Sequence, residues 1–369
     1  MVVHNNIDQH SAIGKLAMWA TKVALEADYD VIAVAKDLDS TLEGEVQYRP
    51  LHVPRAVFAY QWARAHSTVK AALSSASYDL FHTFQPQLTG IADTWHVQFL
   101  TRSAEQTGSF PRGKDALARW RRSQLRIVAR MEDRYLKRLS SSVDVLFPSQ
   151  LMLDEFTKHY GQPPRYQLLP NPSPAIVPLT AEDRRRARQE LIGSFDGTVV
   201  GYLGGLEDRK GWRELADGVA ATPDAFLLFG GPDSVRFRDD RLSGRCHAYG
   251  FVHDLTGFLA ACDVLAVPSS FDPCPLVVTE AASRGVPSIT TPMVGAQEQV
   301  MKFGAGVAWD GRAETFPNIV NDLSQGRANY EAGALAMAEA LSEGRLSESL
   351  LQSWSQALEH RLRRQAPAS

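Results

Sequence analysis

Short apolar runs alternate with longer amphipathic stretches along almost the whole chain, and this alternation restricts the fold more than any other feature. Strands that alternate with helices predict parallel sheets joined by right-handed crossovers, so the chain is expected to be an α/β protein. The expected strands are Val2–His4, Asp30–Ala35, Leu80–Phe84, Val143–Pro148, Gln167–Pro170, Thr198–Leu203, Ala225–Phe229, His247–Phe251, Val264–Pro268, Pro287–Thr290 and Gly306–Trp309.

A chain of 369 residues is long enough for two such domains. The proline-rich start of Asn171–Gly193 is a natural join. We therefore predict an N-terminal domain over 1–175 and a C-terminal domain over 176–345, with a final helix over 346–364 as a candidate to pack back on the first. Other expected helices are Ile13–Leu25, Val57–Ser74, Ala116–Leu139 and Ala181–Leu191.

Composition removes several classes of function. The net charge of −3 gives no general attraction to nucleic acid, and no nucleic-acid partner is expected. The three cysteines, Cys246, Cys262 and Cys274, lack a C-x-x-C spacing, which disfavours a disulfide framework or a zinc site. No apolar run reaches the ~18 residues of a membrane span, and no signal peptide is evident. We expect a cytoplasmic protein, with membrane association left open.

The stretch Asp263–Val300 carries the most chemistry. A buried-strand pattern ends near Pro268, a loop contains Asp272, and the helix that follows contains Glu280. Open parallel sheets bind ligands beyond the carboxyl ends of their strands, and a helix N-terminus favours a phosphate. A carboxylate on the helix can accept hydrogen bonds from ribose hydroxyls, and one before the helix can accept from a sugar. The pattern therefore suits a nucleotide sugar.

A second motif, Gly201–Trp212, ends a strand in glycines and opens a helix with the basic pair Arg209 and Lys210. When a glycosyl bond to a nucleoside diphosphate breaks, negative charge grows on the leaving group. A preorganised cation stabilises that charge, and this kind of electrostatic term is usually the largest in catalysis.

Together these residues resemble the family-four retaining glycosyltransferases (glycosyl transferases group 1). The family pattern is proline-serine, an acid, seven residues, a glutamate, a small-residue helix and glycine-x-proline. The chain matches it with Pro268, Ser269, Asp272, Glu280, Ala281, Ala282, Gly285 and Pro287. The resemblance implies a GT-B fold, in which two Rossmann-like domains with parallel sheets face each other across a cleft. It also implies that Glu280 holds the ribose, that Asp272 faces the transferred sugar, and that Lys210 faces the diphosphate.

The chain departs from the family pattern at three positions. Asp272 stands where the family usually has glutamate, and Pro275, which lacks an N–H, stands where it usually has glycine. Gly205 stands where the family commonly has an arginine, and Arg209 is a candidate substitute. These departures put the identity of the sugar in question more than the nucleotide.

The resemblance extends to residues whose individual signals are weak. It implies that donor contacts come from Gly230, Phe251, Val252, Leu276, Gly295 and Glu298 in the C-terminal half. In the N-terminal half it implies Gly14 near the donor phosphate and His96 in contact with the transferred sugar, the latter counted with the catalytic residues. Turn chemistry or a structural histidine explains each of these equally well.

The stretch 112–138 holds ten basic residues against Asp115, Glu132 and Asp133, with apolar residues at helical spacing. Such a helix lies on anionic lipid or meets a phosphorylated acceptor, or it is a solvated helix packed by one face on its sheet. Both interpretations stay open.

We therefore predict a metal-independent, retaining transfer from a nucleoside-diphosphate sugar, with UDP favoured over GDP, to a hydroxyl of a glycan, lipid-linked or small-molecule acceptor bound by the N-terminal domain. No cofactor is expected, and the acid-x-acid sequence at Asp37 and Asp39 is interpreted as a polar turn. Two alternatives remain: a sugar-nucleotide 2-epimerase of the same fold, and a non-catalytic relative that binds nucleotide or glycan.

Overall fold

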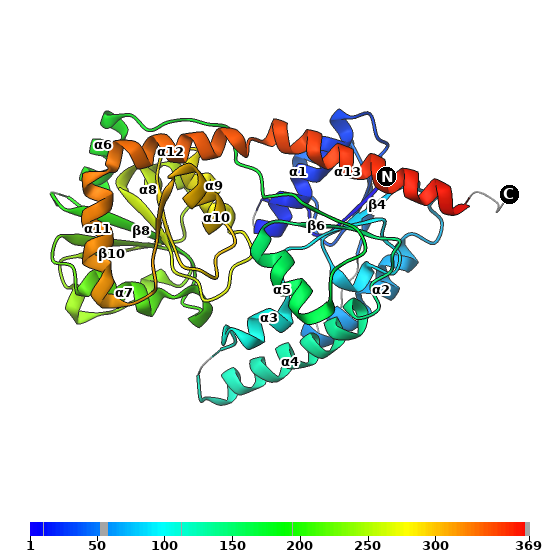
Figure 1. The fold of residues 1–369 in the computed structure, drawn as a ribbon, viewed down its shortest axis with the longest axis horizontal. Coiled ribbons are helices and arrows are strands. Elements are labelled where there is room, and N and C mark those ends of the chain that lie inside the picture. Colours follow the sequence, from blue (N-terminus) through cyan, green and yellow to red (C-terminus); the bar gives the residue numbers. More distant parts are fainter. Residues whose placement is uncertain (10, 52–57, 112, 194, 366–369) are drawn as a thin grey trace. The chain divides into compact units, whose positions relative to one another are not determined.

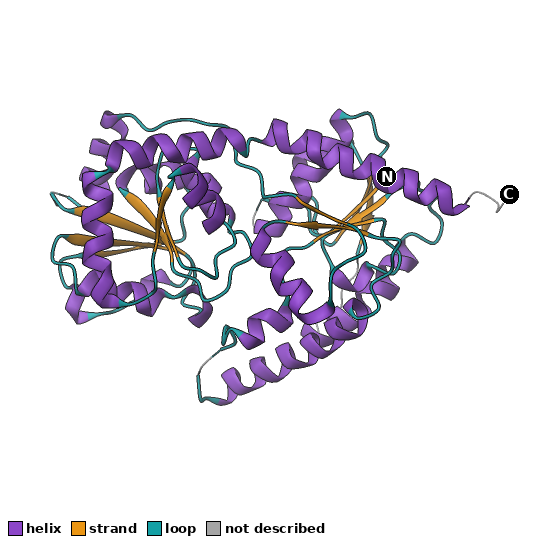
Figure 2. Cartoon of the chain, viewed as in Figure 1, coloured by secondary structure: helices purple, strands orange, loops and turns teal. Residues whose placement is uncertain are grey.

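A computed structural model describes residues 1–9, 11–51, 58–111, 113–193 and 195–365. The chain forms two compact units, each built around a parallel sheet with helices on its faces (Figures 1 and 2). One unit comprises 1–106, 113–170 and 344–369, and the other comprises 107–112 and 171–343. The expected α/β class with two parallel sheets is confirmed. The inclusion of 107–112 in the second unit was not predicted.

The N-terminal unit has a seven-stranded sheet in the order β3-β2-β1-β4-β5-β6-β7, with every neighbouring pair parallel. Its strands are β1 (Val2–His4), β2 (Ile32–Ala35), β3 (Gln47–Pro50), β4 (Phe81–Thr83), β5 (Thr94–His96), β6 (Asp144–Phe147) and β7 (Tyr166–Leu168). Strands β3 and β5 were absent from the sequence prediction.

Helices α1 (Ala12–Glu26), α2 (Phe58–Ala72), α3 (Thr101–Gln106), α4 (Ala116–Leu136), α5 (Gln150–Tyr160) and α13 (Glu343–Gln365) belong almost entirely to this unit. Val57, the first residue of one predicted helix, lies outside the described residues. The predicted C-terminal helix lies within α13. In that helix the indole of the fully buried Trp354 donates a hydrogen bond to the Nδ1 atom of His82 on β4, over 3.3 Å.

The C-terminal unit has a six-stranded parallel sheet in the order β10-β9-β8-β11-β12-β13. Its strands are β8 (Thr198–Leu203), β9 (Ala225–Gly230), β10 (Cys246–Gly250), β11 (Val264–Val267), β12 (Ser288–Thr290) and β13 (Gly306–Ala308). Each of the strands expected in this half is present, and no end differs from its predicted position by more than one residue.

The helices of this unit are α6 (Ala181–Leu191), α7 (Trp212–Ala220), α8 (Leu255–Ala261), α9 (Leu276–Ala282), α10 (Gln297–Phe303), α11 (Phe316–Gln325) and α12 (Arg327–Ala340). Helix α6 has the predicted bounds because its ends are encoded locally. Thr180 and Asp183 form a capping box in which each side chain accepts from the other residue's backbone N–H.

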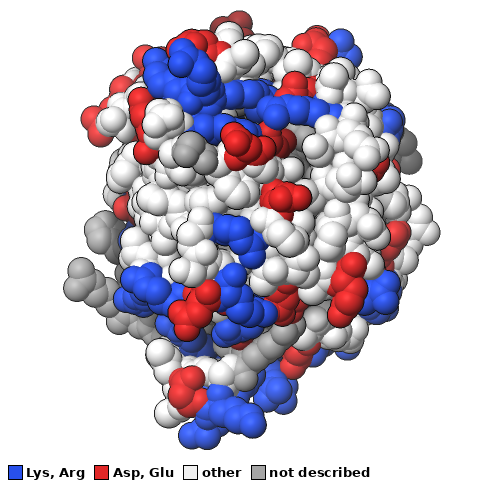
Figure 3. Space-filling model, turned by 90° about the vertical axis from the view of Figure 1, so that its left-hand side faces the viewer, with Lys and Arg blue, Asp and Glu red and all other residues white. Residues whose placement is uncertain are grey.

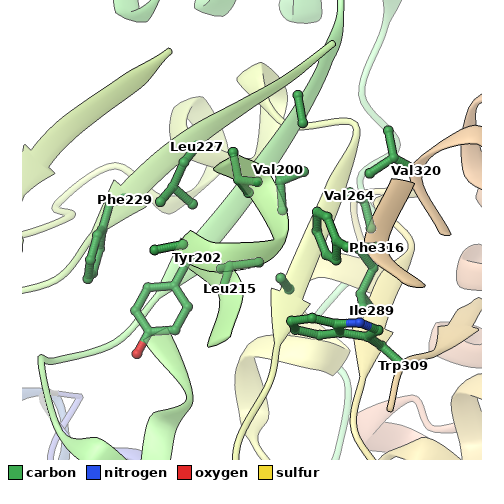
Figure 4. Packing of buried hydrophobic residues seen from close by; sticks show 14 of the residues in the cluster. Val200, Tyr202, Leu215, Leu227, Phe229, Val264, Ile289, Trp309, Phe316 and Val320 are labelled. Atoms are coloured by element: carbon green, nitrogen blue, oxygen red, sulfur yellow. The ribbon is translucent and has the colours of Figure 1, made fainter. Parts of the chain in front are cut away.

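The core of the C-terminal unit lies between its sheet and helices α7 and α11 (Figure 4). Val200, Tyr202, Leu227 and Phe229 come from the two adjacent strands β8 and β9, and Trp309 and Phe316 stack edge to face with centroids 4.9 Å apart. Burial of these apolar side chains anchors the strands whose carboxyl ends carry the predicted motifs.

Charged side chains of both signs are interleaved, with uncharged residues between them, on the face of the molecule seen in Figure 3. Within the described ranges, no helix is long and apolar enough to cross a bilayer.

Candidate functional site

The strand order of the C-terminal sheet reverses between β8 and β11, the first and fourth strands of this sheet along the chain. Connections that leave the carboxyl ends of such strands turn in opposite directions, and open α/β sheets bind ligands at this topological switch point. The loop after β8 contains residues 204–211, and the loop after β11 contains residues 268–275. The two motifs predicted from the sequence therefore start at one edge of the sheet.

Lys210 and Asp272 meet at this edge. The Lys210 Nζ atom lies 2.7 Å from Asp272 Oδ2, and the two side chains are 24% and 10% exposed. Lys210 ends a 3-10 turn, Asp208–Lys210, and Asp272 lies in the loop before α9. Both groups are largely withdrawn from water. A single ligand at this edge can therefore meet a cation, the Lys210 ammonium, and a hydrogen-bond acceptor, the Asp272 carboxylate.

The backbone conformation and close surroundings of Gly211 explain why a glycine follows Lys210. Gly211 adopts φ +69° and ψ 21°, the left-handed conformation, as it connects the 3-10 turn to α7. A Cβ atom at this position would lie 1.9 Å from the carbonyl oxygen of Pro268. The chain therefore needs glycine here both for the backbone conformation and for the close approach of the two loops.

The loop that carries Asp272 is paired with the loop before α10. The Asp272 N–H donates to the carbonyl of Met293 over 2.9 Å, and the Gly295 N–H donates to the carbonyl of Asp272 over 2.8 Å. Asp272 and Val294 form an isolated parallel bridge. The structure thus brings the predicted residue Gly295 next to Asp272.

Helix α9 places the second carboxylate. Pro275 is its N-cap residue and Leu276 its first residue, so Glu280 follows about one turn later and is half-buried. The amide of Asn171 donates to the carbonyl of Cys274 over 2.6 Å and holds the loop just before the helix. Glu280 therefore lies in the same loop–helix segment as Asp272.

The glycine turn after β9 is also at this edge of the sheet. A Cβ atom on Gly230 would lie 2.6 Å from a methyl carbon of Val252, so these two predicted residues pack directly together. Phe251 is 58% exposed, with its ring centroid 4.7 Å from that of His253. An exposed aromatic ring beside a close backbone approach is a surface on which a flat base can lie.

Three other residues that were predicted to contact the nucleotide sugar do not take part in the Lys210–Asp272 pair. The Arg209 Nε atom pairs with Glu207 Oε2 at 2.9 Å instead of joining the Lys210–Asp272 pair. A Cβ built on Gly205 would make only ordinary van der Waals contacts, 3.9 Å from Asp233 and Glu207, so no close approach requires glycine there. Glu298 is exposed in the first turn of α10.

Gly14 and His96 belong to the N-terminal unit. Gly14 is buried in the first turn of α1, where its N–H donates to the N-cap residue Ser11. His96, at the end of β5, is completely buried, and burial lowers its pKa to about 4. Its ring is therefore neutral at neutral pH. The sugar contact implied for His96 stays a prediction.

The N-terminal unit also contains a cavity of about 360 Å³ that involves none of the residues predicted to bind the donor or to act in catalysis. It lies where the chain leaves β2. It is lined by Lys36, Asp37, Leu38, Glu43, Gly44, Val46 and Tyr48. In the same turn Asp39 accepts from the Thr41 N–H and starts a 3-10 turn, Ser40–Leu42.

Sequence reasoning missed Ser109 and gave no role to Ser270. The hydroxyl of Ser270 lies beside the carbonyl of Arg209 and contacts the hydroxyl of Ser109. Ser270 directly follows the proline-serine pair of the motif, which could have drawn attention to it. Ser109 has no local signal, because its partner is 161 positions away in the sequence.

Residues 197–325 match the family described as "Glycosyl transferases group 1". Among curated proteins, the chain is 29% identical over 177 residues to the lipopolysaccharide core biosynthesis glycosyltransferase LpsE of Rhizobium meliloti, covering 45% of this chain and 52% of that protein. It is 28% identical over 226 residues to a D-inositol 3-phosphate glycosyltransferase of Stackebrandtia nassauensis, covering 53% of this chain and 51% of that protein. The matched region thus spans about half the length of these curated relatives.

Solved structures resemble nearly the whole chain. The glycosyltransferase WaaG, involved in lipopolysaccharide biosynthesis, matches with a TM-score of 0.74 and 18% identity over 96% of this chain and 98% of its own. HepE from Anabaena, solved in complex with UDP and glucose, matches with a TM-score of 0.67 and 17% identity over 96% of this chain and 99% of its own. At these identities the matches establish the fold, which is GT-B.

Proposed function

We propose that the chain is a retaining, metal-independent glycosyltransferase that uses a nucleoside-diphosphate sugar, and the match of residues 197–325 to the glycosyl transferases group 1 model supports this. The proposal depends above all on the contact of 2.7 Å between Lys210 and Asp272 at the topological switch point of the C-terminal sheet. There Lys210 faces the diphosphate, Asp272 accepts from hydroxyls of the sugar, and Glu280 accepts from the ribose hydroxyls.

In the proposed reaction the bond between the anomeric carbon and the diphosphate breaks, and a bond from the same carbon to the acceptor oxygen forms on the same face. The acceptor proton passes to an oxygen of the departing diphosphate. Lys210 stabilises the charge that develops on this leaving group, which is the contribution expected of a preorganised cation. The N-terminal unit binds the acceptor, a hydroxyl of a glycan, a lipid-linked sugar or a small molecule.

A UDP-sugar is the favoured donor. HepE, which shares the fold, was solved with UDP and glucose, and this supports a uridine nucleotide here. Gly205 stands where the family commonly has an arginine, and Pro275 lacks an N–H, so fewer protein groups can bind the donor than the family pattern supplies. We therefore expect moderate donor affinity rather than a change of nucleotide.

A panel of UDP-, GDP- and ADP-sugars tests the proposal through the melting temperature of the purified protein and the release of free nucleotide. A ligand at 100 times its Kd stabilises the folded state by about 2.7 kcal/mol, so we expect a UDP-sugar to raise Tm by several degrees. Nucleotide release should persist in excess EDTA. A protein that no nucleotide sugar stabilises, or that converts the donor sugar to its 2-epimer without an acceptor, contradicts the proposal.

We also propose that helix α4 contacts an anionic membrane surface. The helix carries most of the predicted basic residues, Lys114, Lys137 and Arg138 flank its ends, and Arg112 lies outside the described residues. Trp120 and Ile127 are 47% and 41% exposed and are spaced by two turns, so they share one face. Exposed cations surround this face at Lys114, Arg119, Arg121, Arg126, Arg130, Arg134, Lys137 and Arg138.

The acids of this stretch do not cancel those charges. Glu132 is buried, and Asp133 forms a salt bridge with Arg102. Asp115 is the N-cap residue of α4 and accepts from the Ala118 N–H. Cations flanking an exposed aromatic and an exposed aliphatic residue match the chemistry of anionic headgroups over an apolar interior.

Reversing Arg119, Arg126 and Arg130 to glutamate is expected to lower binding to vesicles that contain 30% phosphatidylglycerol by about 100-fold or more, since each basic residue near such a surface contributes about 1 kcal/mol. Vesicle flotation at low and high salt measures the effect. The matched control reverses Arg185, Arg186 and Arg236, which are also exposed cations but belong to the C-terminal unit, and should leave binding unchanged. Equal losses in both triple variants would show that the attraction is not specific to α4.

A further inference from the structure

The segment Thr107–Arg112 joins α3 to α4 of the N-terminal unit, yet it packs as part of the C-terminal unit. Ser109 and Phe110 are only 6% and 7% exposed. Arg112 lies outside the described residues. Ser109 contacts Ser270, in the loop after β11.

A chain of hydroxyl groups connects this segment to the donor loops. Thr107 Oγ1 lies 2.8 Å from Ser109 Oγ, which lies 2.9 Å from Ser270 Oγ. The Ser270 hydroxyl donates to the carbonyl of Arg209 over 3.3 Å, and the Ser270 N–H donates to the same carbonyl over 2.8 Å. A hydroxyl has one proton, so Ser270 accepts from Ser109 while it donates to Arg209.

The carbonyl at the end of this chain belongs to the peptide group between Arg209 and Lys210. The hydroxyl and the N–H of Ser270 both donate to this carbonyl and so fix the plane of the peptide group. The Lys210 side chain starts at the Cα atom that directly follows this peptide group. The Lys210 N–H in turn donates to the carbonyl of Glu207 over 2.9 Å. Hydrogen bonds in series polarise one another, so the hydroxyl of Ser109 strengthens the bond that Ser270 makes to the carbonyl.

The flanking helices are fixed to each other. Glu132 on α4 is buried and accepts from the backbone N–H groups of Thr101 and Arg102, at the start of α3, over 2.9 and 3.1 Å. Arg102 also forms a salt bridge with Asp133. The two helices are therefore held together within the N-terminal unit.

We propose that Ser109 is a positioning residue for the donor diphosphate, which it does not touch: through Ser270 it holds the Arg209–Lys210 peptide so that the Lys210 ammonium faces the β-phosphate. The inference rests on the proposed function, because it assigns Lys210 to the diphosphate. It adds a residue from the N-terminal half of the sequence to the machinery of the donor site, at a position to which the family resemblance gives no role.

Calorimetric binding of UDP and UMP to the full chain tests the inference, because only UDP carries the β-phosphate that Lys210 faces. Ser109→Ala is expected to weaken UDP binding by about 5-fold, the usual effect of losing one hydrogen bond in a site, and to leave UMP binding within twofold. The control Ser67→Ala removes an exposed hydroxyl that bonds only to its own helix at Arg64, and should change neither affinity.

A double-mutant cycle with Ser270→Ala separates a hydroxyl chain from two independent contacts. Since Ser109 acts through Ser270, the double variant should bind UDP within twofold of Ser270→Ala alone. Three results would each overturn the inference while leaving the proposed function intact. In the first, the losses of UDP affinity caused by the two single substitutions multiply in the double variant. In the second, Ser109→Ala leaves the UDP affinity unchanged, and in the third it weakens UDP and UMP binding equally. A wild-type protein that binds no UDP and transfers no sugar overturns both.

Discussion

Replacing Lys210 with alanine is expected to lower the kcat of sugar transfer by about 100- to 1,000-fold, the range seen when one preorganised group that stabilises a leaving anion is removed. Its ammonium lies 2.7 Å from Asp272 and is mostly shielded from water, so its charge acts in a medium where screening is weak. Steady-state and single-turnover rates with a UDP-sugar measure the loss, and circular dichroism checks that the fold persists.

Two further variants show whether the loss comes from charge at this position. Lys210→Arg keeps the charge but presents it on a planar, longer group, so we expect an intermediate loss of about 10-fold. Arg209→Ala removes the neighbouring cation, which pairs with Glu207, and is expected to cost less than about 5-fold. If Lys210→Ala keeps a near-normal rate, or if Arg209→Ala is the more damaging variant, the leaving-group role belongs to another residue.

Much of the C-terminal sheet was predictable because several of its strands are runs of consecutive apolar residues. In β9 and β11, for example, every residue is buried, and such strands stand out from the helices between them. The N-terminal sheet was predicted less completely. Strand β3 reads Gln-Tyr-Arg-Pro and is mostly exposed at the sheet edge, and β5 has only three residues, two of them polar. Their pairing comes from neighbouring strands rather than from their own sequence.

The candidate site also has a part that the sequence predicts and a part that it does not. Lys210, Asp272 and Glu280 could be predicted because each follows a recognisable strand, and parallel topology carries strand ends to one edge. The placement of Ser109 could not be predicted, because it depends on a tertiary contact across 161 residues and on helices whose pairing is set by the buried Glu132. The Arg209–Glu207 pair was also unpredictable, because two acids, Glu207 and Asp208, precede the arginine and either could have paired with it.

Replacing Gly211 with alanine is expected to destabilise the C-terminal unit by about 3 kcal/mol or more. A left-handed backbone costs a residue with a Cβ atom about 1–2 kcal/mol, and here the new methyl group would also lie 1.9 Å from the Pro268 carbonyl. That neighbour is backbone at the end of β11, so it cannot rotate away as a side chain would. For a unit of this size we expect Tm to fall by about 6 °C or more.

Gly205→Ala is the matched control, because the two glycines lie six positions apart in the same loop region. Gly205 does not have a positive φ, and a Cβ atom there meets nothing closer than 3.9 Å, so the change in stability should stay within about 0.5 kcal/mol. Thermal unfolding of both variants gives the comparison directly. Since the Gly211 turn also sets the distance between Lys210 and the Pro268 loop, the alanine variant should lose nucleotide-induced stabilisation even well below its lowered Tm. Equal Tm values for the two variants would contradict the expected clash between the new methyl group and the Pro268 carbonyl.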